Sequence, residues 1–133
     1  SGIGFGSADY CASTGGDMGK ASLAYGRGKI INAAAIYNTT ALDGVWLDFK
    51  DPEGCKAETE YVKSMGFKGR FAIHPDQIKP IHDAYRPSSE ELEWAKGVLE
   101  EAKTAGTGAF KYQGKMVDAP VLAVARLIIS RED

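Results

Sequence analysis

The sequence contains little that points to a membrane, to secretion or to nucleic acid. No apolar run approaches the length of a membrane span, and no basic segment followed by an apolar one opens the chain. Lys and Arg total 16 against 18 Asp and Glu, a formal net charge of -2 that leaves no broad basic surface. We therefore expect neither a membrane nor a nucleic acid as partner. We also expect a cytoplasmic location, or the mitochondrial matrix in a eukaryote.

Cysteine is scarce as well. Cys11 and Cys55 lie far apart and have no histidine at metal-ligand spacing, so we expect reduced, half-buried thiols. What is present is ordinary for a globular protein: 133 residues, 44% of them hydrophobic, enough for a real core. The chain starts at Ser1 and runs directly into the glycine-rich segment 2–6. We interpret this as the beginning of a fragment.

The first two thirds of the sequence alternate between strand and helix patterns. Apolar residues at helical spacing predict a helix over residues 21–37, in which Gly28 suggests close packing. The other elements expected are strands at 1–5, 42–49 and 71–73, a loop at 6–19, a helix at 52–65 stopped by Gly66, and a brief helix from Asp76. Such alternation indicates βαβ units and a parallel sheet.

The pattern changes after Arg86. Ser88 and Glu91 have capping-box spacing, which predicts the start of a helix over 90–103. Alternating residues on either side of Gln113-Gly114 predict a hairpin, and Pro120 opens a last helix that runs to about Ile129. We therefore expect a strand–helix array over 1–86 and an appended helix, hairpin and helix over 87–133.

Three parallel strands are too few for an independent α/β domain. The faces of a parallel sheet need helices and its edges need neighbouring strands. A (β/α)₈ barrel takes about 250 residues, so this chain supplies only the last part of one. Either a larger chain has been cut, or a partner completes the sheet.

Three expected strand ends carry groups that can take part in chemistry. Asp9, Asp48 and His74 follow the three strands, and catalytic groups gather at the C-terminal ends of strands in parallel folds. Each also has a structural alternative. Asp9 can be a turn residue, Asp48 can hydrogen-bond to backbone at the end of its strand, and His74, beside Pro75, can be purely structural. Asp17 and Asp51 look like helix caps, and Asp118 has the position of an N-cap before the last helix.

Five segments, in order across nearly the whole chain, together resemble the citrate lyase β-subunit-like family. That family includes malyl-CoA lyases and belongs to the HpcH/HpaI aldolase superfamily. The segments are Gly6-Ser7-Ala8-Asp9-Tyr10-Cys11-Ala12-Ser13, Leu23-Ala24-Tyr25-Gly26-Arg27-Gly28-Lys29-Ile30, residues 42–54, Ala72-Ile73-His74-Pro75-Asp76-Gln77-Ile78 and Gly114-Lys115-Met116-Val117-Asp118-Ala119-Pro120.

The resemblance implies the C-terminal part of a (β/α)₈ barrel, with three βα units and a C-terminal lid. The resemblance makes Asp9 a ligand of Mg²⁺, together with a Glu from the preceding strand. This chain lacks that strand, and it also lacks the family's substrate-binding Arg. The resemblance makes Asp118 the catalytic acid/base, carried by a lid that reaches a neighbouring subunit of a homotrimer or hexamer. Asp48 and the turn Ile73-His74-Pro75 would contact the substrate and its CoA arm.

The activity implied is Mg²⁺-dependent cleavage of a carbon–carbon bond in a 3-hydroxyacyl-CoA. Substrates of the malyl, β-methylmalyl, citramalyl or citryl type would give an acyl-CoA and a 2-oxo acid, or form from them in reverse. A close variant adds thioester hydrolysis. The 133 residues alone are expected to be inactive. The alternative is a non-catalytic fragment or subunit that completes a partner's barrel.

Overall fold

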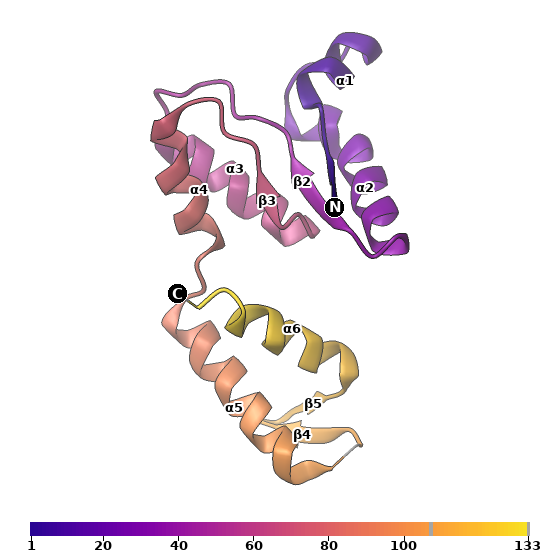
Figure 1. Ribbon diagram of the computed structural model, residues 1–133, viewed down its shortest axis with the longest axis vertical. Helices are drawn as coiled ribbons and strands as arrows, with labels where there is room; N and C mark the ends of the chain where they lie inside the picture. The colour runs from indigo at the N-terminus through magenta and orange to yellow at the C-terminus, as the bar shows by residue number, and fades with distance from the viewer. Residues whose placement is uncertain (107, 133) are drawn as a thin grey trace. The chain divides into compact units, whose positions relative to one another are not determined.

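The computed structural model describes residues 1–106 and 108–132, and the chain divides into two compact units. The first is Ser1–Tyr85 and the second begins at Arg86 (Figure 1). Within the described part of the chain, no helix is long and apolar enough to cross a membrane.

The first unit is built on a three-stranded parallel sheet in the order β1-β2-β3, which confirms the predicted parallel pairing. Ile3 pairs with Ala41, and Asp43 pairs with Arg70. Its elements are β1 (Gly2–Gly4), α1 (Ser7–Thr14), α2 (Lys20–Ile36), β2 (Thr40–Asp43), α3 (Pro52–Met65), β3 (Gly69–Arg70), the 3-10 helix η1 (Pro75–Gln77) and α4 (Ile78–Tyr85).

The two faces of this sheet differ. On one face, Ile3 and Ala41 pack against Ala34 of α2 and Val62 of α3, which forms the main hydrophobic core. Because side chains alternate along a strand, Gly4 belongs to the opposite face. There, a Cβ on Gly4 would lie 2.7 Å from the ring of Phe71. That second face is therefore built from Gly4 and Leu42, with the ring of Phe71 laid across Gly4.

Several predicted boundaries in this unit are wrong. Residues 6–19 are not all loop, because α1 occupies Ser7–Thr14 and ends at Gly15, whose φ of 75° is left-handed. The second strand ends at Asp43 rather than near Phe49: the chain leaves the sheet, and Asp48 accepts a hydrogen bond from the Lys50 N–H in a turn. Apolar composition alone overestimated the length of this strand.

The third strand is also displaced from its predicted position. It covers Gly69–Arg70 instead of 71–73. The Phe71 N–H still donates to the carbonyl of Asp43 in β2, but the Ile73 N–H donates to the side chain of Gln77, so the pairing with β2 ends there. Close packing in α2 occurs at Gly26, where a Cβ would lie 2.8 Å from Phe5, and not at Gly28, which has open space around it.

Of the two helix caps predicted in this unit, one is confirmed and one is wrong. Asp51 is the N-cap of α3 and accepts a hydrogen bond from the Gly54 N–H at 2.9 Å, while Gly66 ends the helix with φ of 118°. Asp17 is not the N-cap residue of α2, which is Gly19; its carboxylate instead accepts from the Gly19 N–H and the Ser22 hydroxyl. Both hydrogen bonds lower the pKa of Asp17, and the bond from Ser22 has the larger effect.

Both cysteines are free thiols and are fully buried rather than half-buried. Cys55 in α3 is 0% exposed, and desolvation by burial raises the pKa of its thiol. A raised thiol pKa keeps the sulfur protonated near neutral pH. Cys55 therefore belongs to the core and is not a reactive nucleophile.

The second unit is two helices and a hairpin, as predicted. Its elements are α5 (Ser89–Ala105), β4 (Phe110–Tyr112), β5 (Lys115–Val117) and α6 (Ala119–Ile129). The hairpin turns at Gln113 and Gly114, both with positive φ, the geometry of a two-residue turn that matches strand twist. Its core is Ala95, Val98, Val117 and Ala125.

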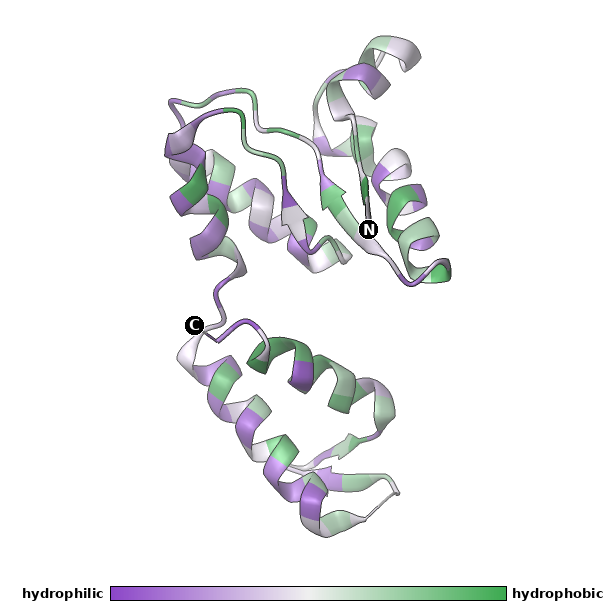
Figure 2. Cartoon of the chain, viewed as in Figure 1, coloured by the Kyte–Doolittle hydropathy of each residue, from purple (hydrophilic) through white to green (hydrophobic). Residues whose placement is uncertain are grey.

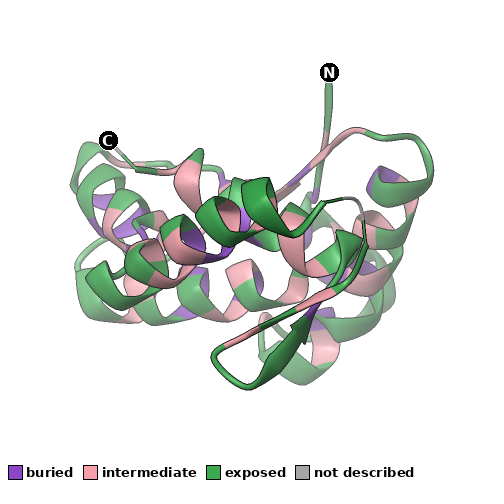
Figure 3. Ribbon diagram, turned by 90° about the horizontal axis from the view of Figure 1, so that it is seen from below, coloured by how far each residue is buried: buried purple, intermediate pink, exposed green. Residues whose placement is uncertain are grey.

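Helix α6 is apolar around most of its circumference, and Figure 2 shows it green along most of its length. Each helix carries both buried and exposed residues (Figure 3). In α6, Ala125 is 0% exposed, whereas Val124 and Leu127 are exposed. The exposed apolar residues of α6 mean that its outer side is less polar than is usual for a surface helix.

Ser88 anchors the start of α5 through a capping box. Its hydroxyl accepts from the Glu91 N–H at 3.1 Å, and the Glu91 carboxylate accepts from the Ser88 N–H at 2.8 Å. We expect Ser88→Ala to lower the free energy of unfolding by about 0.5–2 kcal/mol, measured by urea denaturation. Ser130→Ala, which removes an exposed hydroxyl near the end of α6, is the control and should change it by less than about 0.5 kcal/mol. Equal effects would contradict this role for Ser88.

Candidate functional site

A pocket lies where β1 and β2 end. Its volume is about 270 Å³, and it is lined by residues 4–9 together with Gly44, Val45 and Phe71. We call it the strand-end pocket. Parallel strands place their carboxyl ends at one edge of a sheet, which is where parallel α/β folds bind their ligands.

Asp9 is at this pocket, in the first turn of α1, and its carboxylate is exposed. Helix α1 begins after Gly6, and no side chain in the described residues caps it. Its first backbone N–H groups and its positive dipole end therefore lie at the pocket, an arrangement that favours anions. The structure thus gives the predicted Asp9 a surrounding that suits a carboxylate-bearing ligand.

The residues at the strand-end pocket fit a magnesium ion that is held by few protein ligands. Across residues 1–106 and 108–132, no three His, Cys, Asp or Glu side chains are grouped to hold a metal. Mg²⁺, however, is usually held by one or two protein carboxylates, with water and substrate oxygens completing its octahedron. Asp9 forms no ion pair with any described residue, so its exposed oxygens fit one such position.

A buried ionic network, which the sequence interpretation missed, braces the neighbouring strand end. Asp43 is 0% exposed and accepts hydrogen bonds from Arg27 at 3.1 and 3.2 Å and from Arg70 at 2.7 Å. Arg27 also donates to Glu58 at 2.8 Å, and Arg70 to the carbonyl of Gly44 at 2.9 Å. The network thus fixes the end of β2 and Gly44, the residue after it, which lines the strand-end pocket.

Arg27 shows how the network holds its charges. Burial acts to lower the pKa of its guanidinium, but the hydrogen bonds and charges of Asp43 and Glu58 outweigh burial and raise that pKa. The sequence contained two hints: Arg27 lies inside the apolar pattern of a helix, and Asp43 lies inside a predicted strand. The network that they form with Glu58 and Arg70 joins residues from four elements and is not visible from local spacing.

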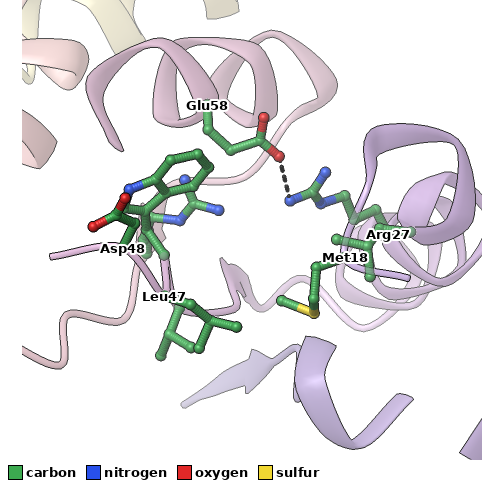
Figure 4. Close-up of a pocket in the computed structure, with 9 residues that line it drawn as sticks. Met18, Arg27, Leu47, Asp48 and Glu58 are labelled. Carbon is green, nitrogen blue, oxygen red and sulfur yellow. Dashed lines mark hydrogen bonds and ion pairs between the residues drawn. The ribbon is translucent and has the colours of Figure 1, made fainter. Parts of the chain in front are cut away.

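A second pocket, of about 280 Å³, opens beside the network (Figure 4). Arg27 and Glu58 face each other in it, and Met18, Leu47 and the exposed Asp48 lie on its other sides. The Arg27 Nη1 and the Trp46 Nε1 have no hydrogen-bond partner among the residues described. Asp48 is therefore at a different pocket from Asp9.

The loop after β2 contacts the loop after β3. The rings of Phe49 and His74 stack with centroids 4.7 Å apart, and Gln77 donates to the carbonyl of Trp46 at 2.6 Å. His74 Nδ1 accepts from the Asp76 N–H at 3.2 Å, while Ile73 and Pro75 are exposed. The structure thus brings His74 next to the segment that carries Asp48, and Pro75 opens η1.

Asp118 lies in the second unit, at the junction of β5 and α6. It is the N-cap of α6, and its Oδ1 accepts a hydrogen bond from the Val121 N–H. The N···O distance of 3.4 Å is long for such a bond. The side chain is exposed. The structural alternative for Asp118 is thus confirmed, and a weak, solvent-facing cap bond leaves the other carboxylate oxygen available.

The fold is that of a known family. A family model described as C-C Bond Lyase of the TIM-Barrel fold matches residues 28–132, and the chain belongs to that family. This confirms the resemblance found in the sequence.

Individual relatives agree with the family. The mitochondrial citramalyl-CoA lyase of Rattus norvegicus is 34% identical over 131 residues, 95% of this chain and 39% of the relative. The protein CitE of Mycobacterium tuberculosis, solved with magnesium, acetoacetate and coenzyme A, gives a TM-score of 0.80 at 36% identity, covering 98% of this chain and 51% of that one.

The citrate lyase beta subunit of M. tuberculosis, solved with oxaloacetate and magnesium, gives a TM-score of 0.59 at 33% identity, covering 65% of this chain and 42% of that one. The chain spans about two fifths of the length of the curated lyase that it matches.

Proposed function

We propose that this chain is the C-terminal part of a Mg²⁺-dependent carbon–carbon lyase that acts on a 3-hydroxyacyl-CoA. Substrates of the malyl, β-methylmalyl, citramalyl or citryl type would be split into an acyl-CoA and a 2-oxo acid, or formed from them. The observation that carries the proposal is the placement of Asp9 in the strand-end pocket of a member of the lyase family. Two relatives support it: one is named a citramalyl-CoA lyase, and another is a citrate lyase beta subunit solved with oxaloacetate and magnesium.

In this proposal, residues 1–86 are the last three βα units of a (β/α)₈ barrel. The sheet order β1-β2-β3 leaves one side of β1 and one side of β3 without a strand among those described. A barrel supplies neighbours at both sides. The face of the sheet opposite the helices, built from Gly4, Leu42 and Phe71, would then line the inside of the barrel.

Asp9 would be one protein ligand of the magnesium ion, with a Glu from a preceding strand as the second. When bound, the metal ion supplies Lewis-acid stabilisation of negative charge on the 2-oxo acid. Asp9 holds a carboxylate at the rim of the pocket, and the positive end of α1 orients an anionic substrate group beside it.

Asp118 would be the general acid/base, carried on a lid formed by residues 87–133. In the cleavage direction the Asp118 carboxylate would take the proton of the 3-hydroxyl, the adjacent carbon–carbon bond would break to leave the 2-oxo acid, and its electron pair would move into the thioester as an enolate. Asp118 would then return the same proton to the enolate carbon, which gives the acyl-CoA. In reverse, it would remove that proton from the acyl-CoA and give it to the newly formed hydroxyl. Its exposure and its single long cap bond support this role.

Asp48 and the turn Ile73-His74-Pro75 would contact the substrate and its CoA arm. The stacked rings of Phe49 and His74 hold these two loops together. Ile73 is 54% exposed, so an apolar side chain is offered to a ligand. A pantetheine arm combines apolar stretches with amides, which suits such a wall.

The lid would act in a neighbouring subunit of a homotrimer or hexamer. Exposed apolar residues on this unit, Met116, Val124 and Leu127, support a covered surface. The open sides of β1 and β3 also favour a second candidate function, a non-catalytic subunit that completes a partner's barrel.

The metal role of Asp9 is tested by Asp9→Asn in the full-length protein. The amide is a poorer Mg²⁺ ligand than the carboxylate. We therefore expect turnover of citramalyl-CoA to fall by roughly a hundredfold or more, the scale expected when an essential charged group is lost. Titration with Mg²⁺ should show weaker binding. Glu60→Gln, the same charge change on the exposed side of α3, is the control. Wild-type turnover and Mg²⁺ affinity in Asp9→Asn would contradict the proposal.

A further inference from the structure

The first residue of α1, Ser7, has a buried hydroxyl without a partner. Its side chain is 2% exposed, and its Oγ has no hydrogen-bond partner within the described residues. The Ser7 N–H bonds to the carbonyl of Phe5 at 3.0 Å, which fixes the backbone. Ser7 also lines the strand-end pocket that contains Asp9. A buried polar group of this kind needs an acceptor, which here can come from a ligand.

Gly44 leaves the space in which this hydroxyl sits. A Cβ on Gly44 would lie 2.0 Å from the Ser7 Oγ, a distance no side chain tolerates. Asp43, the preceding residue, points toward Arg27 on the side of the helices. Gly44, the next residue, lines the strand-end pocket together with Gly4, Ser7 and Phe71. The hydroxyl of Ser7 is therefore on the ligand side of the sheet.

We propose that Ser7 is a substrate-contacting residue, whose hydroxyl donates a hydrogen bond to an oxygen of the 2-oxo acid. This inference rests on the proposed function. The same pocket holds Asp9, the proposed Mg²⁺ ligand, so the hydroxyl lies where the 2-oxo acid would bind the metal ion. The uncapped start of α1 favours an anionic acceptor at the same place.

Binding and stability separate this role from a structural one. If Ser7 only packs, Ser7→Ala removes an unpaired buried hydroxyl and should leave binding of the acid unchanged. If Ser7 donates to the acid, the variant should melt at the same temperature or higher and bind the acid more weakly. The two roles therefore predict different outcomes for a single methyl-for-hydroxymethyl change.

The experiment is calorimetric titration of oxaloacetate, with Mg²⁺ present, into the full-length protein and its Ser7→Ala and Ser7→Gly variants. We expect both variants to raise the Kd for oxaloacetate by roughly ten- to a hundredfold, the range for a hydrogen bond to a charged group. The Kd for Mg²⁺ alone should not change. Ser64→Ala, which removes an exposed hydroxyl of α3, is the matched control and should bind like the parent.

Two results would overturn the role of Ser7 alone: parental affinity in Ser7→Ala, or a loss confined to Ser7→Gly, which would show that the methylene and not the hydroxyl matters. If the parent protein itself binds no oxaloacetate in the presence of Mg²⁺, the proposed function fails and the inference with it. The parental titration therefore distinguishes the failure of the proposed function from the failure of Ser7.

Discussion

Asp118→Asn in the full-length protein should lower turnover by roughly a hundredfold or more while leaving the melting temperature nearly unchanged. Asn and Asp are almost equal as N-caps, so the amide can still accept from the Val121 N–H at the start of α6. An amide cannot take up and return a proton. Measuring turnover and melting in the same variant thus separates the acid/base from the cap.

A matched control exists in the first unit. Asp51 is the N-cap of α3 and accepts from the Gly54 N–H, so Asp51→Asn makes the same chemical change at another helix start. It should alter neither turnover nor melting by much. A stable Asp118→Asn variant with turnover close to that of Asp51→Asn would remove Asp118 from the mechanism.

The largest effect on stability is expected at Asp43. Its carboxylate is 0% exposed and pairs with Arg27 and Arg70. Asp43→Asn would remove the carboxylate that both buried guanidinium groups share, and only Arg27 would keep its ion pair with Glu58. Breaking a buried ion pair costs about 3–5 kcal/mol. Urea unfolding should show a loss of that size.

The control for Asp43 is an exposed ion pair. Glu60 bonds to Lys56 across one turn of α3, and Glu60→Gln should change the free energy of unfolding by less than about 1 kcal/mol. If Asp43→Asn costs no more than Glu60→Gln, the network does not stabilise the first unit. Arg70 also holds the carbonyl of Gly44, so a looser network should disturb the strand-end pocket as well.

Elements with strong local signals were predictable from the sequence. The caps Asp51 and Ser88 and the stop at Gly66 are confirmed, because capping depends on residues three or four positions apart. The turn at Gln113-Gly114 follows the same logic. Elements decided by distant contacts were not predictable. Strand β2 ends at Asp43, where Arg27 and Arg70 hold the chain, and apolar composition continues past that point.

The site divides in the same way. Asp9 is recognisable from its position after a strand, and the structure places it in a pocket. Helix α1, which carries it, was missed because its sequence is rich in small and polar residues. The space that Gly44 leaves for the Ser7 hydroxyl joins residues 37 positions apart, so no spacing rule indicates it. The catalytic role of Asp118 stays a prediction.

The most direct measurement of the central claim is product analysis by mass spectrometry. The full-length protein would be incubated with Mg²⁺ and citramalyl-CoA, and in parallel with malyl-, β-methylmalyl- and citryl-CoA. At least one substrate should give an acyl-CoA and a 2-oxo acid in equal amounts, such as acetyl-CoA and pyruvate. Chelation with EDTA should stop their release and added Mg²⁺ should restore it. Free CoA with an intact hydroxy acid, or no product from any of the four, would contradict carbon–carbon cleavage.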